Sequence, residues 1–224
     1  MMLRTAFDQD LRRLQDEVLK LGARVEEALL TAVEALRTRD LDASQRLVAA
    51  DRAIDELRYR IEADTLTVIA LQQPTAGDLR TLAAVLFICN ELERIGDYGK
   101  GIGRVNVKIG AEELMKPLID IPRMAAIAQT MVHESLRAFV HRDVHLAEHV
   151  IARDEEVDSL YDQIYSELIT LLFADVSRIR QANLLLMAAH NLERAADRAT
   201  NICERVIYCV TGELLDTGWE EDVA

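Results

Sequence analysis

Cysteine, proline, glycine and aromatic residues are all scarce in this chain of 224 residues. The 3 cysteines (Cys89, Cys203 and Cys209) are an odd number without CxxC spacing, which argues against disulfides and thiolate metal sites. We expect all of them to be buried, apolar side chains in a reducing cytoplasm. With 9 glycines and 3 prolines, and with Ala, Leu, Glu and Arg dominant, the composition favours an all-helical protein.

Positively charged residues are also scarce. Lys and Arg number 26 against 39 Asp and Glu, so the formal net charge is −13 and the isoelectric point is about 4.8. No basic stripe could collect phosphate groups, which excludes nucleic acid and anionic lipid as direct partners. No stretch of ~18 uncharged apolar residues exists to span a membrane, and the N-terminus lacks the core of a signal peptide. These absences predict a cytoplasmic protein.

Apolar residues make up 50% of the chain and recur at helical spacing. The pattern predicts helices over about 3–39, 41–72, 75–109, 121–140, 144–173 and from about 176 to 210. We expect an all-α fold of two tandem antiparallel three-helix bundles related by internal duplication. The predicted parts are a first repeat (1–110), a linker (111–123), a second repeat (124–211) and an acidic tail (212–224).

The duplication is visible in paired acidic motifs. Asp51-x-x-Ile54-Asp55 corresponds to Asp154-x-x-Val157-Asp158 at an offset of 103, and Glu93-x-x-x-Asp97 corresponds to Glu193-x-x-x-Asp197 at an offset of 100. Residues four apart lie on one face of a helix. Positions 51 and 97 have their midpoint at 74, as do positions 55 and 93, and residue 74 is a proline at which the chain would turn back. The second set has its midpoint at 175.5, beside Asp175.

Two hairpins therefore bring four carboxylates each to the same height. We name these sets the first quartet, made of Asp51, Asp55, Glu93 and Asp97, and the second quartet, made of Asp154, Asp158, Glu193 and Asp197. Like charges repel, so each quartet requires protonation, arginine partners or bound cations. Oxygen ligands in this number suit Mg, Ca, Mn or iron, in bridged clusters. The alternative is a solvated surface with salt bridges to Arg52, Arg94, Arg153 and Arg194.

Two other patterns are weaker. The spacing of His145 and His149 would let them share a metal ion, but no glutamate joins them in a catalytic motif. Glycines surround Lys100 without the order of a phosphate-binding loop, so we interpret them as sites of close helix packing. No Glu-x-x-His pair joins the acids, which disfavours a ferritin-type di-iron site.

With these duplicated acidic motifs in two three-helix units, the chain resembles the PhoU family of phosphate-transport regulators over nearly its whole length. The resemblance implies a cytoplasmic, non-enzymatic accessory protein of the high-affinity phosphate ABC transporter. Such a protein represses phosphate-starvation genes through the transporter ATPase subunit and a sensor histidine kinase, reaches the membrane only through these partners, and forms a homodimer. The resemblance also implies metal cations on both quartets, with iron first and Zn, Mn, Mg or Ca as further candidates. Ala196 and Thr200 stand where the first repeat has Gly96 and Lys100, so the occupancy of the two sites can differ.

Two functions from other classes remain open. A metalloenzyme, either a phosphatase or an oxidase, could use the quartets, but it would need an open coordination position and a base or nucleophile nearby. A purely structural helical protein would bind no cation at all.

Overall fold

The structure is a computed structural model that describes residues 2–213. Helices account for nearly all of this range. In chain order they are α1 (Met2–Thr38), α2 (Leu41–Ala50), α3 (Arg52–Gln72), α4 (Ala76–Ile109), α5 (Asp120–His141), α6 (Val144–Ala152), α7 (Asp154–Ala174), the 3-10 turn η1 (Val176–Arg178) and α8 (Ile179–Thr211). In this described range no helix is both long enough and apolar enough to cross a membrane.

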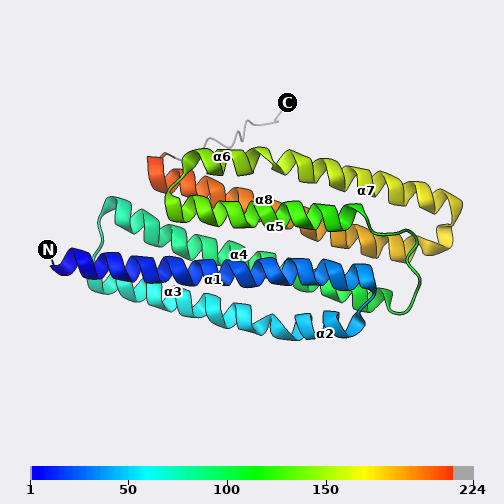
Figure 1. The fold of residues 1–224 in the computed structure, drawn as a ribbon, viewed down its shortest axis with the longest axis horizontal. Helices are drawn as coiled ribbons and strands as arrows, with labels where there is room; N and C mark the ends of the chain where they lie inside the picture. Colours follow the sequence, from blue (N-terminus) through cyan, green and yellow to red (C-terminus); the bar gives the residue numbers. More distant parts are fainter. Residues whose placement is uncertain (1, 214–224) are drawn as a thin grey trace, which may run out of the picture.

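Each of two units has three layers of helices, and the two units lie next to each other with their helices along the long direction of the molecule (Figure 1). One unit contains α1, α2–α3 and α4, and the other contains α5, α6–α7 and α8. The long helices α1, α4, α5 and α8 form the centre, while α2–α3 and α6–α7 lie on opposite flanks. The two units run in opposite directions, because α1 and α5 are antiparallel, as are α4 and α8. The predicted all-α fold with an internal duplication is confirmed.

The two flanking helices were each expected to be continuous, but each is interrupted once. The break between α2 and α3 lies at Asp51, and the break between α6 and α7 lies at Arg153. Both residues keep helical backbone angles, so each interruption is a bend and not a loop. The bend places Asp51 at the start of α3, where its side chain leaves the helix end uncapped and turns towards α4.

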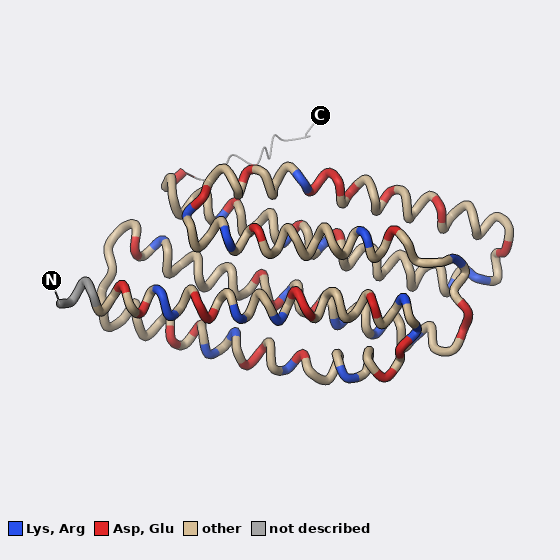
Figure 2. The backbone as a smooth tube through the Cα atoms, viewed as in Figure 1, with Lys and Arg blue, Asp and Glu red and all other residues tan. Residues whose placement is uncertain are grey.

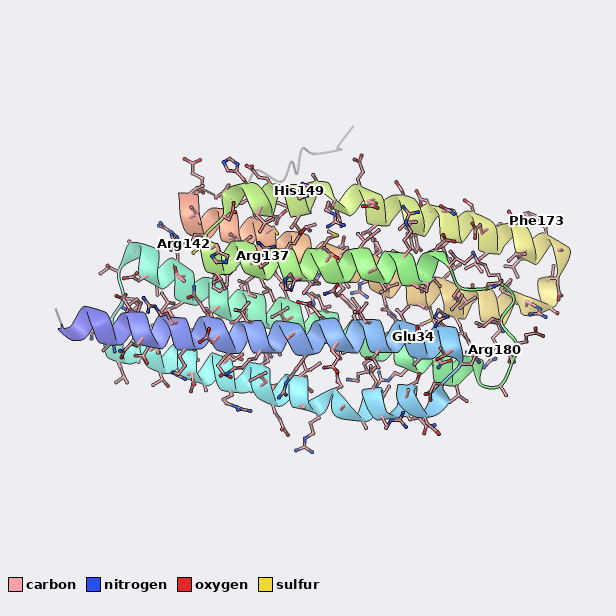
Figure 3. The ribbon with its side chains drawn as sticks, viewed as in Figure 1. Glu34, Arg137, Arg142, His149, Phe173 and Arg180 are labelled. Atoms are coloured by element: carbon pink, nitrogen blue, oxygen red, sulfur yellow. The ribbon has the colours of Figure 1, made fainter. Side chains whose placement is uncertain are left out.

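Acidic caps fix the turns, as the sequence indicated for Asp40. The Asp40 carboxylate accepts a hydrogen bond from the Ala43 amide at 2.7 Å, and the equivalent Asp143 accepts one from Leu146 at 3.0 Å. Such a cap satisfies an amide that the helix leaves free. Arg142, which precedes Asp143 and has φ of 55°, donates weakly to Thr81 and to the Cys209 carbonyl (Figure 3). The α5–α6 turn is thereby attached to α4 and α8.

The linker between the two units is shorter than the linker predicted from the sequence. Helix α5 begins at Asp120, so Pro122 lies in its first turn, where a missing amide hydrogen is tolerated. Of the acidic tail expected at 212–224, all but the first two residues lie outside the described range.

One hydrophobic core runs through both units and is centred on the packing of α4 against α8. A buried polar contact lies within this packing. Glu91 of α4 is 3% exposed and lies 3.3 Å from the Arg198 guanidinium of α8, and it accepts a hydrogen bond from Asn201 at 3.1 Å. A carboxylate can be buried only with such partners. The Arg194 guanidinium also stacks on the Tyr98 ring, 4.6 Å from its centroid. The two repeats therefore pack directly against each other through α4 and α8.

Candidate metal centres

The fold brings the first quartet together, as the sequence predicted. Asp51 and Asp55 come from the beginning of α3, and Glu93 and Asp97 come from the middle of α4, across the hairpin. The pKa of Glu93 is raised, first by burial and then by the charge of Asp97, with Asp55 and Asp51 adding to the effect. The other three carboxylates of the first quartet are thus close enough to act on Glu93.

A lysine already stands among these acids. The Lys100 ammonium donates to Asp51 at 2.5 Å and to Asp97 at 3.1 Å, so it bridges α3 and α4. Asp51 is only 7% exposed, and this contact accounts for its burial. The hydrogen bond to Asp51 is the largest cause of a raised pKa for Lys100, which keeps the ammonium charged. Sequence reasoning missed this role, although the spacing of three residues between Asp97 and Lys100 is a signal for it.

The second quartet comes together in the same way between α7 and α8, but it has no lysine. Burial raises the pKa of Asp154 from 3.8 to about 6, and the charges of Asp158, Asp197 and Glu193 add to the rise. The pKa values of Asp158 and Glu193 are raised as well, by burial first and then by Asp197. Burial and mutual repulsion therefore disfavour the ionised form of three of these four groups.

The lack of compensation follows from the residues at the equivalent positions. Thr200 replaces Lys100, and its hydroxyl donates to the Asp197 backbone carbonyl at 2.7 Å. Every charged residue of α7 is acidic, whereas α3 interleaves arginines with its acids (Figure 2). One oxygen each of Asp154 and Glu193 is buried without a hydrogen-bond partner.

A histidine and an arginine approach the second quartet from its edge. The His190 Nδ1 atom lies 3.1 Å from Glu193, without hydrogen-bond alignment. The Arg198 guanidinium lies 3.9 Å from the Asp197 carboxylate, further than its 3.3 Å to Glu91. Neither group forms ion pairs with acids of both helices, as Lys100 does with Asp51 of α3 and Asp97 of α4.

The arginines expected as partners of the quartets have other contacts. Arg52, Arg94 and Arg153 form ion pairs at 2.9, 3.7 and 3.4 Å, and Arg194 stacks on a ring at 4.6 Å. Their partners are, in the same order, Glu56, Glu91, Glu134 and Tyr98. None of these four arginines forms an ion pair with a quartet residue, although the charge of Arg194 lowers the pKa of Glu193 against the larger effects of burial and Asp197.

The donor chemistry of the second quartet fits a hard divalent cation, because it offers carboxylate oxygens and two of them lack partners. The first quartet fits poorly while Lys100 bridges it. Within residues 2–213 no three acidic, His or Cys side chains form a ready-made metal site, so binding at either quartet would require side-chain rotation. His145 and His149 are both exposed on the outer helix α6, and His145 lies 3.4 Å from Glu148 (Figure 3).

Comparison with known proteins identifies the family of this chain. A family model described as the PhoU domain matches it twice, over residues 18–105 and 121–206. The chain belongs to the PhoU family. The two matched segments coincide with the two repeats, so each repeat is one PhoU domain.

The PhoU relatives match at nearly full length. The phosphate-specific transport system accessory protein PhoU homologue of Clostridium acetobutylicum is 34% identical over 96% of this chain and 99% of its own. The homologue of Caulobacter vibrioides is 37% identical over 94% of this chain and 92% of its own. The crystal structure of the phosphate transport system regulatory protein PhoU from Streptococcus pneumoniae superposes with a TM-score of 0.87, at 31% identity, over 94% of this chain and 99% of that one.

The two PhoU repeats also differ in shape beside their quartets. A pocket of about 380 Å³ opens next to the first quartet, with Asp51 and Lys100 in its wall and small residues such as Ala28 and Ala50 lining it. In the second repeat Met131 and Arg153 stand at the positions of these two alanines. Larger side chains therefore occupy the equivalent region. No pattern in the sequence predicts this pocket.

Proposed function

We propose that this protein is a regulatory, non-enzymatic accessory protein of a phosphate transport system. The observation that carries the proposal is the match to relatives of that name over 96% of this chain and 99% of theirs. The PhoU relative with the matching crystal structure is itself described as a regulatory protein.

We further propose that the protein works in the cytoplasm as a negative regulator of phosphate-starvation signalling. Its partners would be the ATPase subunit of the phosphate ABC transporter and a sensor histidine kinase, and membrane association would occur through them. The acidic surface supports this, since a net charge of −13 opposes direct adhesion to anionic lipid. We also propose that the protein forms a homodimer.

The third part of the proposal concerns cations. The quartets would bind divalent metal, and the second quartet (Asp154, Asp158, Glu193 and Asp197) is the better candidate because two of its carboxylate oxygens are buried without a hydrogen-bond partner, whereas Lys100 bridges the first. Iron, Mn, Mg, Ca and Zn are the candidate ions. A bound ion would supply positive charge that draws α7 and α8 together on the flank of the second repeat. The chain's own residues hold the carboxylates in place through the packing of Val157 and Leu192 in the core.

Deletion of the gene in its native host tests the regulatory role. Expression of a phosphate-starvation reporter in high phosphate should rise on deletion and return to its repressed level on complementation. Normal repression in the deletion strain would remove the negative-regulator proposal.

A pull-down from the same strain, with the tagged protein as bait, tests the partners. The transporter ATPase subunit and the sensor kinase should be recovered from wild type. Their absence after cross-linking would contradict the proposed partnership while leaving the family assignment unchanged.

A further inference from the structure

We propose that Lys100 is a built-in counter-ion that takes the place of a metal ion in the first quartet, so that divalent cations bind the second quartet alone. This inference rests on the proposed cation binding and assigns it to one of two acidic sites that the duplication makes equivalent. It also assigns a specific role to residue 100 and to its counterpart, residue 200.

The first step is the geometry of the ammonium. Lys100 contacts one acid from each helix of the hairpin, Asp51 at 2.5 Å and Asp97 at 3.1 Å. A bridging metal ion would need to contact the same two helices. The Lys100 side chain is 21% exposed and that of Asp51 is 8% exposed, so the pair is largely shielded from water. Shielding strengthens the attraction and makes separation of the pair costly.

The second step is competition. A divalent cation at the first quartet would have to take Asp51 and Asp97 from Lys100. It would then leave an ammonium, largely shielded, next to a doubly charged ion. Like charges at that distance repel strongly in a partly desolvated site. Lys100 therefore disfavours metal binding at the first quartet for two reasons. It already contacts the carboxylates that would be ligands, and its charge repels the cation.

The third step excludes poor access as the cause. Asp51 and Lys100 both line the pocket of about 380 Å³, which opens to solvent beside the first quartet. A hydrated ion can reach these side chains. The first quartet is thus accessible, and the difference between the two quartets lies in their charge.

The fourth step is the internal comparison that the duplication provides. Thr200 occupies the position of Lys100, with no charge and with its hydroxyl bonded to its own helix. In that repeat one oxygen each of Asp154 and Glu193 is buried without a hydrogen-bond partner, whereas Asp51 and Asp97 of the first quartet both contact Lys100. At the position from which an ammonium bridges the two helices of the first quartet, the second quartet thus has an uncharged side chain.

Mn²⁺ titration of the full-length, metal-stripped protein tests the proposal, with bound ion measured by electron paramagnetic resonance and by elemental analysis. Wild type should bind Mn²⁺, and Asp154→Asn with Asp197→Asn should abolish this binding. The pair Asp51→Asn and Asp97→Asn should leave it unchanged.

The decisive variants exchange the two residues between the repeats. Lys100→Thr should roughly double the bound Mn²⁺, because the two quartets offer the same kind of ligand. Thr200→Lys should abolish binding to the second quartet. Lys108→Thr is the matched control, because Lys108 is exposed on the same helix and its loss changes the net charge equally. That control should bind the same amount of Mn²⁺ as wild type.

Lys100→Gln provides a second variant in case threonine disturbs folding, since glutamine retains length and hydrogen bonding without charge. Helical circular dichroism of each variant reports whether it folds. The proposal is overturned if neither Lys100 variant gains Mn²⁺, or if the first-quartet pair of substitutions removes binding from wild type. The proposal is also overturned if no variant binds Mn²⁺. The reporter assay of the gene deletion tests the regulatory function separately, so the two can fail independently.

Discussion

Asp154→Asn should stabilise the metal-free protein at neutral pH. The Asp154 carboxylate has a buried oxygen without a partner, and its pKa is raised from 3.8 to about 6. A rise of that size corresponds to at most about 3 kcal/mol of unfavourable interaction of the ionised form. Because the side chain is only partly buried, solvent screens the interaction, and we expect a gain of about 1–1.5 kcal/mol in the free energy of unfolding.

The effect should depend on pH with a definite sign. The folded state holds the Asp154 proton more tightly than the unfolded state, so its contribution to stability is complete below about pH 3.8. That contribution is lost as the pH rises towards about 6. Urea unfolding in the presence of a chelator, followed by helical circular dichroism, should therefore show little difference between wild type and Asp154→Asn near pH 4 and the full difference at pH 7.5.

The equivalent substitution in the first repeat is the control. Asp51→Asn removes the closer partner of Lys100 and leaves a buried amide beside the ammonium. We expect a loss of about 1–3 kcal/mol at pH 7.5, since Asp97 still contacts Lys100. The two substitutions, at equivalent positions, should therefore change the free energy of unfolding in opposite directions. A destabilising effect of both substitutions, at similar size, would refute it.

Three further predictions test the packing. Gly22→Ala should lower the free energy of unfolding by about 1–3 kcal/mol in urea denaturation, because a Cβ atom there would overlap the buried Leu136 side chain. Asp143→Ala should cost about 1 kcal/mol in the same assay, since it removes the cap of α6. Cys89 and Cys203, whose pKa values burial raises to about 12, should resist a thiol reagent at pH 8 until urea is added.

The sequence was sufficient to predict the quartets because their positions follow from helix geometry alone. Residues equidistant from Pro74 meet across a hairpin, and the chain does turn there, between Gln72 and Ala76. The capping role of Asp40 is equally local, since a cap depends on the three residues that follow it. Whether the quartets bind metal stays a prediction.

The bridging role of Lys100 depends on how two helices face each other. Its nitrogen reaches Asp51, 49 positions earlier, because α3 packs against α4. Periodicity within one helix could not show which acid across the hairpin the Lys100 side chain contacts. The burial of Glu91 was hidden for a similar reason. A glutamate beside an apolar stripe is normally exposed, and its burial follows from the packing of one repeat on the other.

The contact between Glu91 and α8 also means that the two halves have lost their interchangeability. If two copies of the first repeat met as the two halves meet here, Glu91 would face Tyr98 and Gly101, which stand at the positions of Arg198 and Asn201. Glu91 would then keep only the 3.7 Å ion pair with Arg94 of its own repeat, and both copies would lack the guanidinium and the amide that α8 supplies here. The second repeat therefore provides the first with partners that a second copy of the first repeat does not carry.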